Sequence, residues 1–156
     1  MNKLILPLVL IILVSGCIKQ SGEGIFLKAS IAPANYDWSD AKLQQYGFIQ
    51  NEKFSLEFTA TKYLSKTDGL MTIDVQLPEA VRPLSGETHW QGNDVSKTIS
   101  IEAEAEKKGK YEIEVTATNT ANDYTASNKI TVCIGEDLEE IKTYCTGEIS
   151  PPPLPA

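Results

Sequence analysis

Residues 99–117 read ISIEAEAEKKGKYEIEVTA and carry the clearest structural signal in the chain. Apolar side chains take every second position on both sides of the Lys107-Lys108-Gly109 turn, with polar side chains between them. A repeat of two residues is that of a β-strand with one buried and one wet face. The stretch therefore predicts two half-buried strands joined by a turn.

The glutamates of this stretch allow two arrangements. In a simple hairpin Glu104 would face Glu112, and Glu102 would face Glu114. Like charges directly opposite each other are destabilising, so a hairpin would need a cation between them. If the two strands lie in different sheets, the conflict disappears. We favour separate sheets because that arrangement requires no bound ion.

The same alternation recurs through the rest of the chain. The expected strands cover residues 25–31, 54–58, 71–77, 99–105, 111–117 and 124–134. After the first of them, Ser39-Asp40 is expected to cap a short helix that runs through Tyr46 and stops at Gly47. About seven short strands, each with one apolar face, predict an all-β antiparallel sandwich. Another kind of sandwich or an open barrel is the alternative.

Three short segments resemble the immunoglobulin-like repeats of archaeal and bacterial surface proteins. They are Leu77–Val81, Gly86–Trp90 and Gly109-Lys110-Tyr111. The resemblance implies an immunoglobulin-like domain in which Tyr111 forms the tyrosine corner, its hydroxyl bonded back to the preceding chain. Two features depart from antibody domains: the core cysteine pair is missing, and residues 71–77 carry no tryptophan.

The first residues have the pattern of an export signal. A basic start, Met1-Asn2-Lys3, precedes an apolar run of 11 residues, which is too short to span a bilayer. Val14-Ser15-Gly16-Cys17 then resembles the lipobox of prokaryotic lipoproteins, which implies cleavage after residue 16 and a lipid on Cys17. Residues 17–24 are the expected flexible tether. An ordinary signal peptide with an incidental cysteine is the alternative.

Composition limits what the exported part can be. Removal of residues 1–16 from the 156 leaves 140, enough for one domain, which we place at residues 25–147 before a Pro-rich disordered tail at 148–156. Loss of Lys3 changes the net charge from −7 to −8. Because an acidic surface repels phosphate backbones, nucleic acid is not an expected partner.

The remaining cysteines form an even pair. With Cys17 assigned to lipid, Cys133 and Cys145 are expected to form a disulfide, as is usual outside the cytoplasm. Alternation in the last strand turns Cys133 to the wetter face, so the bridge should fold the C-terminal segment back along an open sheet edge. Zinc is the competing interpretation, but two cysteines and one distant histidine do not supply four ligands.

No pattern in the sequence predicts a catalytic, metal or cofactor site. His89 lies near Ser85, but the spacing fits no hydrolytic arrangement, so we interpret His89 as a turn residue. Trp38 and Trp90 are expected to pack on the core edges, with ligand contact as the alternative. The acidic loop residues lack the spacing of a calcium loop and are interpreted as solvated: Asn93, Asp94, Asn122, Asp123, Glu136 and Asp137. Arg82-Pro83 is similar to one loop of immunoglobulin-like cysteine-protease inhibitors, whose other loops have no counterpart here.

These observations predict a non-enzymatic lipoprotein of a prokaryotic, and more specifically archaeal, cell. Its domain would lie outside the cytoplasm, held to the cell membrane by the lipid on Cys17, and would bind an unknown protein or glycan or serve a structural role. The alternative function is an accessory lipoprotein subunit of an envelope transporter or secretion complex.

Overall fold

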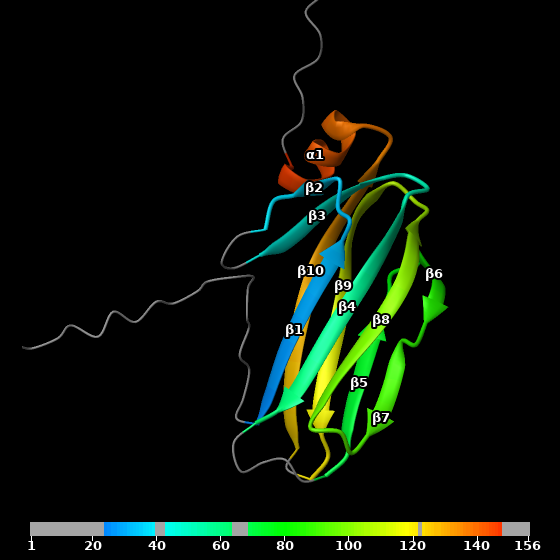
Figure 1. Cartoon of the computed structure of the whole chain (residues 1–156). Helices are drawn as coiled ribbons and strands as arrows, with labels where there is room; N and C mark the ends of the chain where they lie inside the picture. The colour runs from blue at the N-terminus through cyan, green and yellow to red at the C-terminus, as the bar shows by residue number, and fades with distance from the viewer. Residues whose placement is uncertain (1–23, 40–42, 64–68, 122, 148–156) are drawn as a thin grey trace, which may run out of the picture.

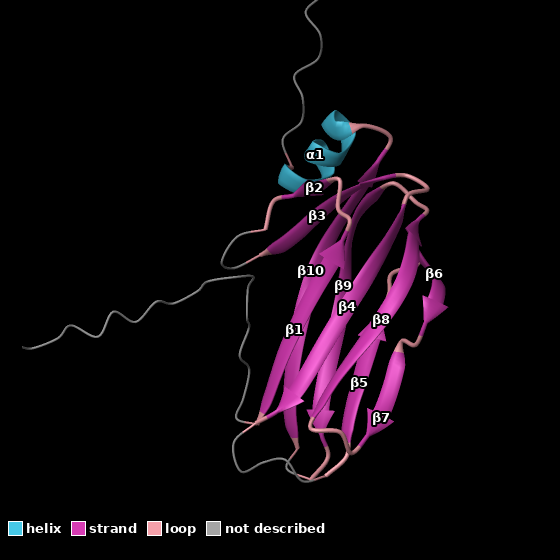
Figure 2. Ribbon diagram, viewed as in Figure 1, coloured by secondary structure: helices cyan, strands magenta, loops and turns pink. Residues whose placement is uncertain are grey.

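The computed structural model describes residues 24–39, 43–63, 69–121 and 123–147. Within these ranges the protein is all-β, with two sheets packed face to face and one short helix at one end (Figures 1 and 2). The predicted signal segment, Cys17, most of the tether, Asn122 and the Pro-rich tail lie outside the described residues.

One sheet has four antiparallel strands in the order β1-β4-β8-β6. Their bounds are β1 Ile25–Ala32, β4 Lys53–Lys62, β8 Ser96–Ala105 and β6 Val81–Gly86. The central pair, β4 and β8, is in register from Lys53 opposite Glu104 to Thr61 opposite Ser96. This register puts the apolar residues of both strands on the inner face.

The second sheet has six strands in the order β2-β3-β10-β9-β5-β7. Their bounds are β2 Tyr36–Asp37, β3 Gln44–Ile49, β10 Tyr124–Gly135, β9 Gly109–Asn119, β5 Met71–Gln76 and β7 His89–Gly92. Strand β3 runs parallel to β10, and the other pairs are antiparallel.

Strands β8 and β9, which carry the residues 99–117 signal, lie in different sheets. The predicted separation is therefore confirmed, and the four glutamates do not face one another. Glu104 lies opposite Lys53 and is paired with Arg82, whereas Glu112 lies opposite Thr131 on β9's neighbour β10.

The core fills the space between the sheets with the inward residues of both. Leu56, Phe58, Ile101, Ile113 and Val115 are completely buried there. Because each strand supplies an inner residue at every second position, the alternation seen in the sequence becomes one continuous apolar layer.

The helix predicted through Tyr46 is wrong. Residues 44–49 form β3, and the hydroxyl of Ser39 accepts a hydrogen bond from the Gln45 N–H instead of capping a helix. Backbone pairing with β10 stabilises the strand, and that partner lies more than 80 positions along the chain. Local sequence contains no record of such a pairing, so tertiary context decided the structure here.

The structure also contains a helix that was not predicted, α1 (Leu138–Thr146). It begins at Asp137, whose side chain accepts a hydrogen bond from the Glu140 N–H, and ends at Gly147 in the left-handed conformation. No helix in the described part of the chain is long and apolar enough to span a bilayer.

The described chain starts and finishes at opposite ends of the sandwich (Figure 1). Gly24 is buried against the Tyr124 ring where β1 and β10 begin. Helix α1 lies at the other end, where β10 finishes. The structured domain therefore includes Gly24, the last residue of the predicted tether.

Candidate functional site

The disulfide joins helix α1 to the outer face of the six-stranded sheet. Cys133 on β10 is bonded to Cys145 on α1, with their Cα atoms 5.6 Å apart. Ile141 packs beside them and is completely buried, and the half-buried Tyr36, Trp38 and Tyr144 surround the group. A second, smaller apolar cluster thus forms outside the main core.

Two parts of the disulfide prediction need correction. Cys133 does lie on the face away from the core, but helix α1 covers it, so its surroundings are dry. The bridge also does not protect a sheet edge, because β10 is an interior strand between β3 and β9. Both errors follow from the elements that the sequence did not predict, β3 and α1.

A polar network attaches the other side of helix α1 to the β8–β9 turn. The Lys108 ammonium lies 3.0 Å from carboxylate oxygens of both Glu136 and Glu140. These hydrogen bonds, the one to Glu136 first, raise the pKa of Lys108. A hydrogen bond from the Glu136 N–H, reinforced by Lys108, lowers the pKa of Glu140. A hydrogen bond to Glu140 raises the pKa of Tyr144.

Tyr111 lies near the start of β9, with its hydroxyl 2.8 Å from the Lys108 carbonyl oxygen, to which it donates. Ile113, two residues further on, is completely buried in the core. The ring of Tyr111 also packs against Gly109, which has φ of +137°. This contact orders the turn that presents Lys108 to helix α1.

Strands β6 and β7 mark the point where one edge segment changes sheets. Strand β6 pairs with β8 of the four-stranded sheet, and β7 pairs with β5 of the six-stranded sheet only three positions later. Gly86 ends β6 with φ of +95°, and a Cβ there would lie 2.2 Å from the Ser100 carbonyl oxygen. Glycine is therefore required for β6 to touch β8 and then turn away.

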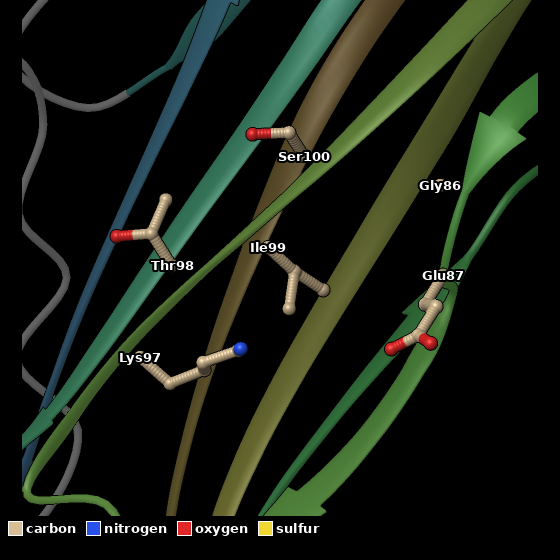
Figure 3. A pocket seen from close by; sticks show the side chains of 6 residues that line it. All are labelled: Gly86, Glu87, Lys97, Thr98, Ile99 and Ser100. Atoms are coloured by element: carbon tan, nitrogen blue, oxygen red, sulfur yellow. The ribbon is translucent and has the colours of Figure 1, made fainter.

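A shallow pocket of about 220 Å³ opens where β6 leaves β8. Its lining comes from Gly86, Glu87, Lys97, Thr98, Ile99 and Ser100. Figure 3 shows the Lys97 ammonium and the Glu87 carboxylate extending toward the space between them, with the Ile99 side chain beside that space. The Lys97 ammonium also lies 5.3 Å from the centre of the Trp90 ring, a cation–π contact.

The backbone of β8 is paired on one side only along this pocket. Its odd-numbered residues direct their backbone groups toward β4: the Ala105 N–H donates to the carbonyl of Glu52, just before β4, and the carbonyl of Val95, just before β8, accepts from the Lys62 N–H. Its even-numbered residues direct their backbone groups toward β6. The Ser100 carbonyl is directed at Gly86, and the N–H of Glu106, just after β8, donates to the carbonyl of Ala80, just before β6. Strand β6, however, pairs only with residues 101–105. The N–H and C=O groups of Ser96 and Thr98 therefore lie on this side of β8 without a strand partner in the described structure, and Thr98 lines the pocket.

The other residues considered for chemistry do not assemble a reactive group. His89 lies with Nδ1 2.6 Å from a carboxylate oxygen of Asp74, and both side chains are more than half exposed. Ser85 lies on β6 opposite Glu102 of β8, in the four-stranded sheet, whereas His89 lies on β7 of the six-stranded sheet. Within the described residues no three His, Cys, Asp or Glu side chains form a group able to hold a metal ion. Arg82, noted for the inhibitor-like loop, is paired with Glu104 and Glu106.

Sequence reasoning did not identify the pocket. Its backbone groups belong to ordinary strand residues, and only Gly86, which has a positive φ, marks the place where β6 departs. Trp90 packs against the core as expected, and Trp38 packs instead on the outer cluster under helix α1.

Comparison with known proteins gives no family. No protein-family model matches the chain, and no curated protein matches it. It is similar to a FixG-related protein from Vibrio parahaemolyticus, with a TM-score of 0.38 and 9% identity over 69% of this chain and 95% of that one. It is also similar to the VesB protease of Vibrio cholerae, with a TM-score of 0.32 and 16% identity over 58% of this chain and 30% of that one. Likenesses this low carry no argument about function.

Proposed function

We propose that this chain is a surface lipoprotein, anchored by a lipid on Cys17, whose immunoglobulin-like domain is a non-catalytic binding or structural module. The observation that carries the proposal is the position of Gly24. The chain enters the sandwich at the end opposite helix α1, so an anchor on Cys17 would leave the helix end farthest from the membrane. Seven residues separate Cys17 from β1 and reach at most about 25 Å when extended.

The strand order supports the immunoglobulin-like assignment. Constant-type immunoglobulin domains pair strands A, B, E and D in one sheet and C, F and G in the other. Strands β1, β4, β8 and β6 take the first set of places, and β5, β9 and β10 take the second. The Tyr111 hydroxyl bonds back to the Lys108 carbonyl at the start of β9, as a tyrosine corner does at the start of strand F.

Lipid labelling and fractionation test the anchor. Cells expressing the full chain are fed an alkyne-tagged fatty acid, and the protein is followed in membrane and soluble fractions. We expect the tag on the wild type and its loss from Cys17→Ser, which should leave the membrane or remain uncleaved. Cys145→Ser is the matched control, because it removes a cysteine from the folded domain and should keep the tag. An untagged wild type, or a Cys17→Ser variant that stays processed and membrane-bound, would contradict the proposal.

A further inference from the structure

We infer that the open segment of β8, residues 96–100, is a docking site for an extended peptide of a partner protein, added as a strand beside β8. The inference rests on the proposed binding role of the domain and names the class of partner. It follows from three features of the pocket: the unpaired backbone of β8, the apolar side chain of Ile99, and the charges of Lys97 and Glu87.

The unpaired backbone determines the kind of ligand. Ser96 and Thr98 each direct one N–H and one C=O to the side of β8 that β6 has left, and those of Thr98 lie at the pocket. Alternating donors and acceptors two residues apart are matched by another strand, which provides the same groups at the same spacing. Strand β6 already pairs antiparallel with β8 up to Ile101, so an added strand would continue that direction.

The side chains determine which residues the peptide should carry. In an antiparallel pair, opposite residues share a face, so the peptide residues opposite Ile99 and Lys97 point into the pocket. Ile99 is 5% exposed and offers an apolar contact. Lys97 makes no ion pair within the described structure, and its ammonium extends into the same space. The site therefore fits a peptide with an apolar residue, any residue and then an acidic residue, in that order.

Glu87 adds a preference at the beginning of the peptide. It follows Gly86 and lines the pocket on the side where an added antiparallel strand would begin. A carboxylate there favours a free amine or a basic residue at the peptide's start and disfavours an acidic one. The two charges of the pocket thus assign a direction to the peptide as well as a composition.

The test uses the full chain purified in detergent and the pentapeptide Thr-Val-Thr-Glu-Thr, with a free amine and a dye at its carboxyl end. Fluorescence anisotropy should show weak, saturable binding. Two N-methylated forms make a matched pair that requires no change in the protein. N-methylation of the central threonine removes the N–H that would bond to Thr98 and should weaken binding about tenfold or more. N-methylation of the valine removes an N–H that points away from β8 and should change binding less than about threefold.

Two protein variants test the same contacts from the other side. Thr98→Pro removes the N–H that faces the pocket and leaves the β4–β8 ladder its odd-numbered bonds, so binding should fall about tenfold. Thr98→Val removes only the hydroxyl bonded to Thr59 and is the control for that loss. Lys97→Gln should abolish the preference for Thr-Val-Thr-Glu-Thr over Thr-Val-Thr-Lys-Thr. Circular dichroism verifies that each variant is folded.

Equal effects of the two N-methyl groups, or no saturable binding of the unmodified peptide, would overturn the inference. Those results would leave the membrane anchor intact if Cys17→Ser still releases the protein. Peptide binding by a protein that carries no lipid would instead refute the anchor and support the docking site.

Discussion

Opening the Cys133–Cys145 bridge should loosen helix α1 before it affects the sandwich. The helix has nine residues, which is too short for stability in isolation, and Ile141 is its main apolar contact apart from Cys145. The sheets beneath it keep their own core, which the bridge does not cross. We therefore expect a local transition in residues 138–146 and a separate, cooperative unfolding of the two sheets.

The size of the effect follows from the loop that the bridge closes. The two cysteines are 12 positions apart, so the chain-entropy relation gives about 3 kcal/mol of stabilisation at 25 °C. A domain of about 120 residues has an unfolding entropy of about 250 cal/mol/K, so this loss corresponds to a fall in melting temperature of about 12 °C. This value is an upper limit, because a helix that undocks loses only its docking free energy.

Calorimetry and amide hydrogen exchange measure the two effects separately. The Cys133→Ala/Cys145→Ala variant is compared with the wild type in its oxidised and reduced forms. Exchange should accelerate at residues 138–146 and stay slow in the middle of β9 and β10. Unchanged exchange in the helix would refute its dependence on the bridge. Loss of the cooperative transition would show instead that the sandwich itself depends on the bridge.

Two further predictions concern the contacts between the β8–β9 turn and the helix end. Tyr111→Phe removes the hydrogen bond to the Lys108 carbonyl and should lower the free energy of unfolding by about 1 kcal/mol in a urea titration, whereas an unchanged midpoint would contradict this role. Because the pKa of Glu140 is lowered from its usual 4.5, its stabilisation of the helix end is complete above that pH and is lost as the pH falls through the lowered value. The protection factors of the α1 amides, which correct exchange for its intrinsic pH dependence, should therefore fall with acid below pH 4.5, and Glu140→Gln should remove most of that dependence; an identical acid response in the variant would refute the assignment.

Sequence alone predicted those parts of the fold that depend on repeated local patterns. The alternation in residues 99–117 gave two strands and, through the repulsion between glutamates, their placement in separate sheets. The even count of cysteines outside Cys17 gave the pairing that the structure contains. The alternation and the glutamate repulsion act between residues that are close in the sequence. The disulfide could be predicted because only two cysteines remained to pair.

The errors occur where distant segments meet. Residues 44–49 have an ordinary mixture of Gln, Tyr and Gly and become a strand because β10 lies beside them. Helix α1 has an acidic start that was interpreted as a solvated loop, although Asp137 and Glu140 fit an N-terminal cap. That signal was present in the sequence and was missed. The pocket beside β8 exists because β6 separates from β8 after Gly86. Residues of β6, distant in sequence from Thr98, determine that point.

The opposite placement of Gly24 and Gly147 has a mechanical consequence. A pull between these two residues acts along the strands, so it loads the β1–β4 ladder in shear and stretches its hydrogen bonds together rather than one after another. At the other end the disulfide passes the force from Cys145 directly to Cys133, which lies near the end of β10 and is still paired with β9. Helix α1 and the turn before it are thereby excluded from the path of tension. The domain should extend little under force until β1 slides as a unit along β4.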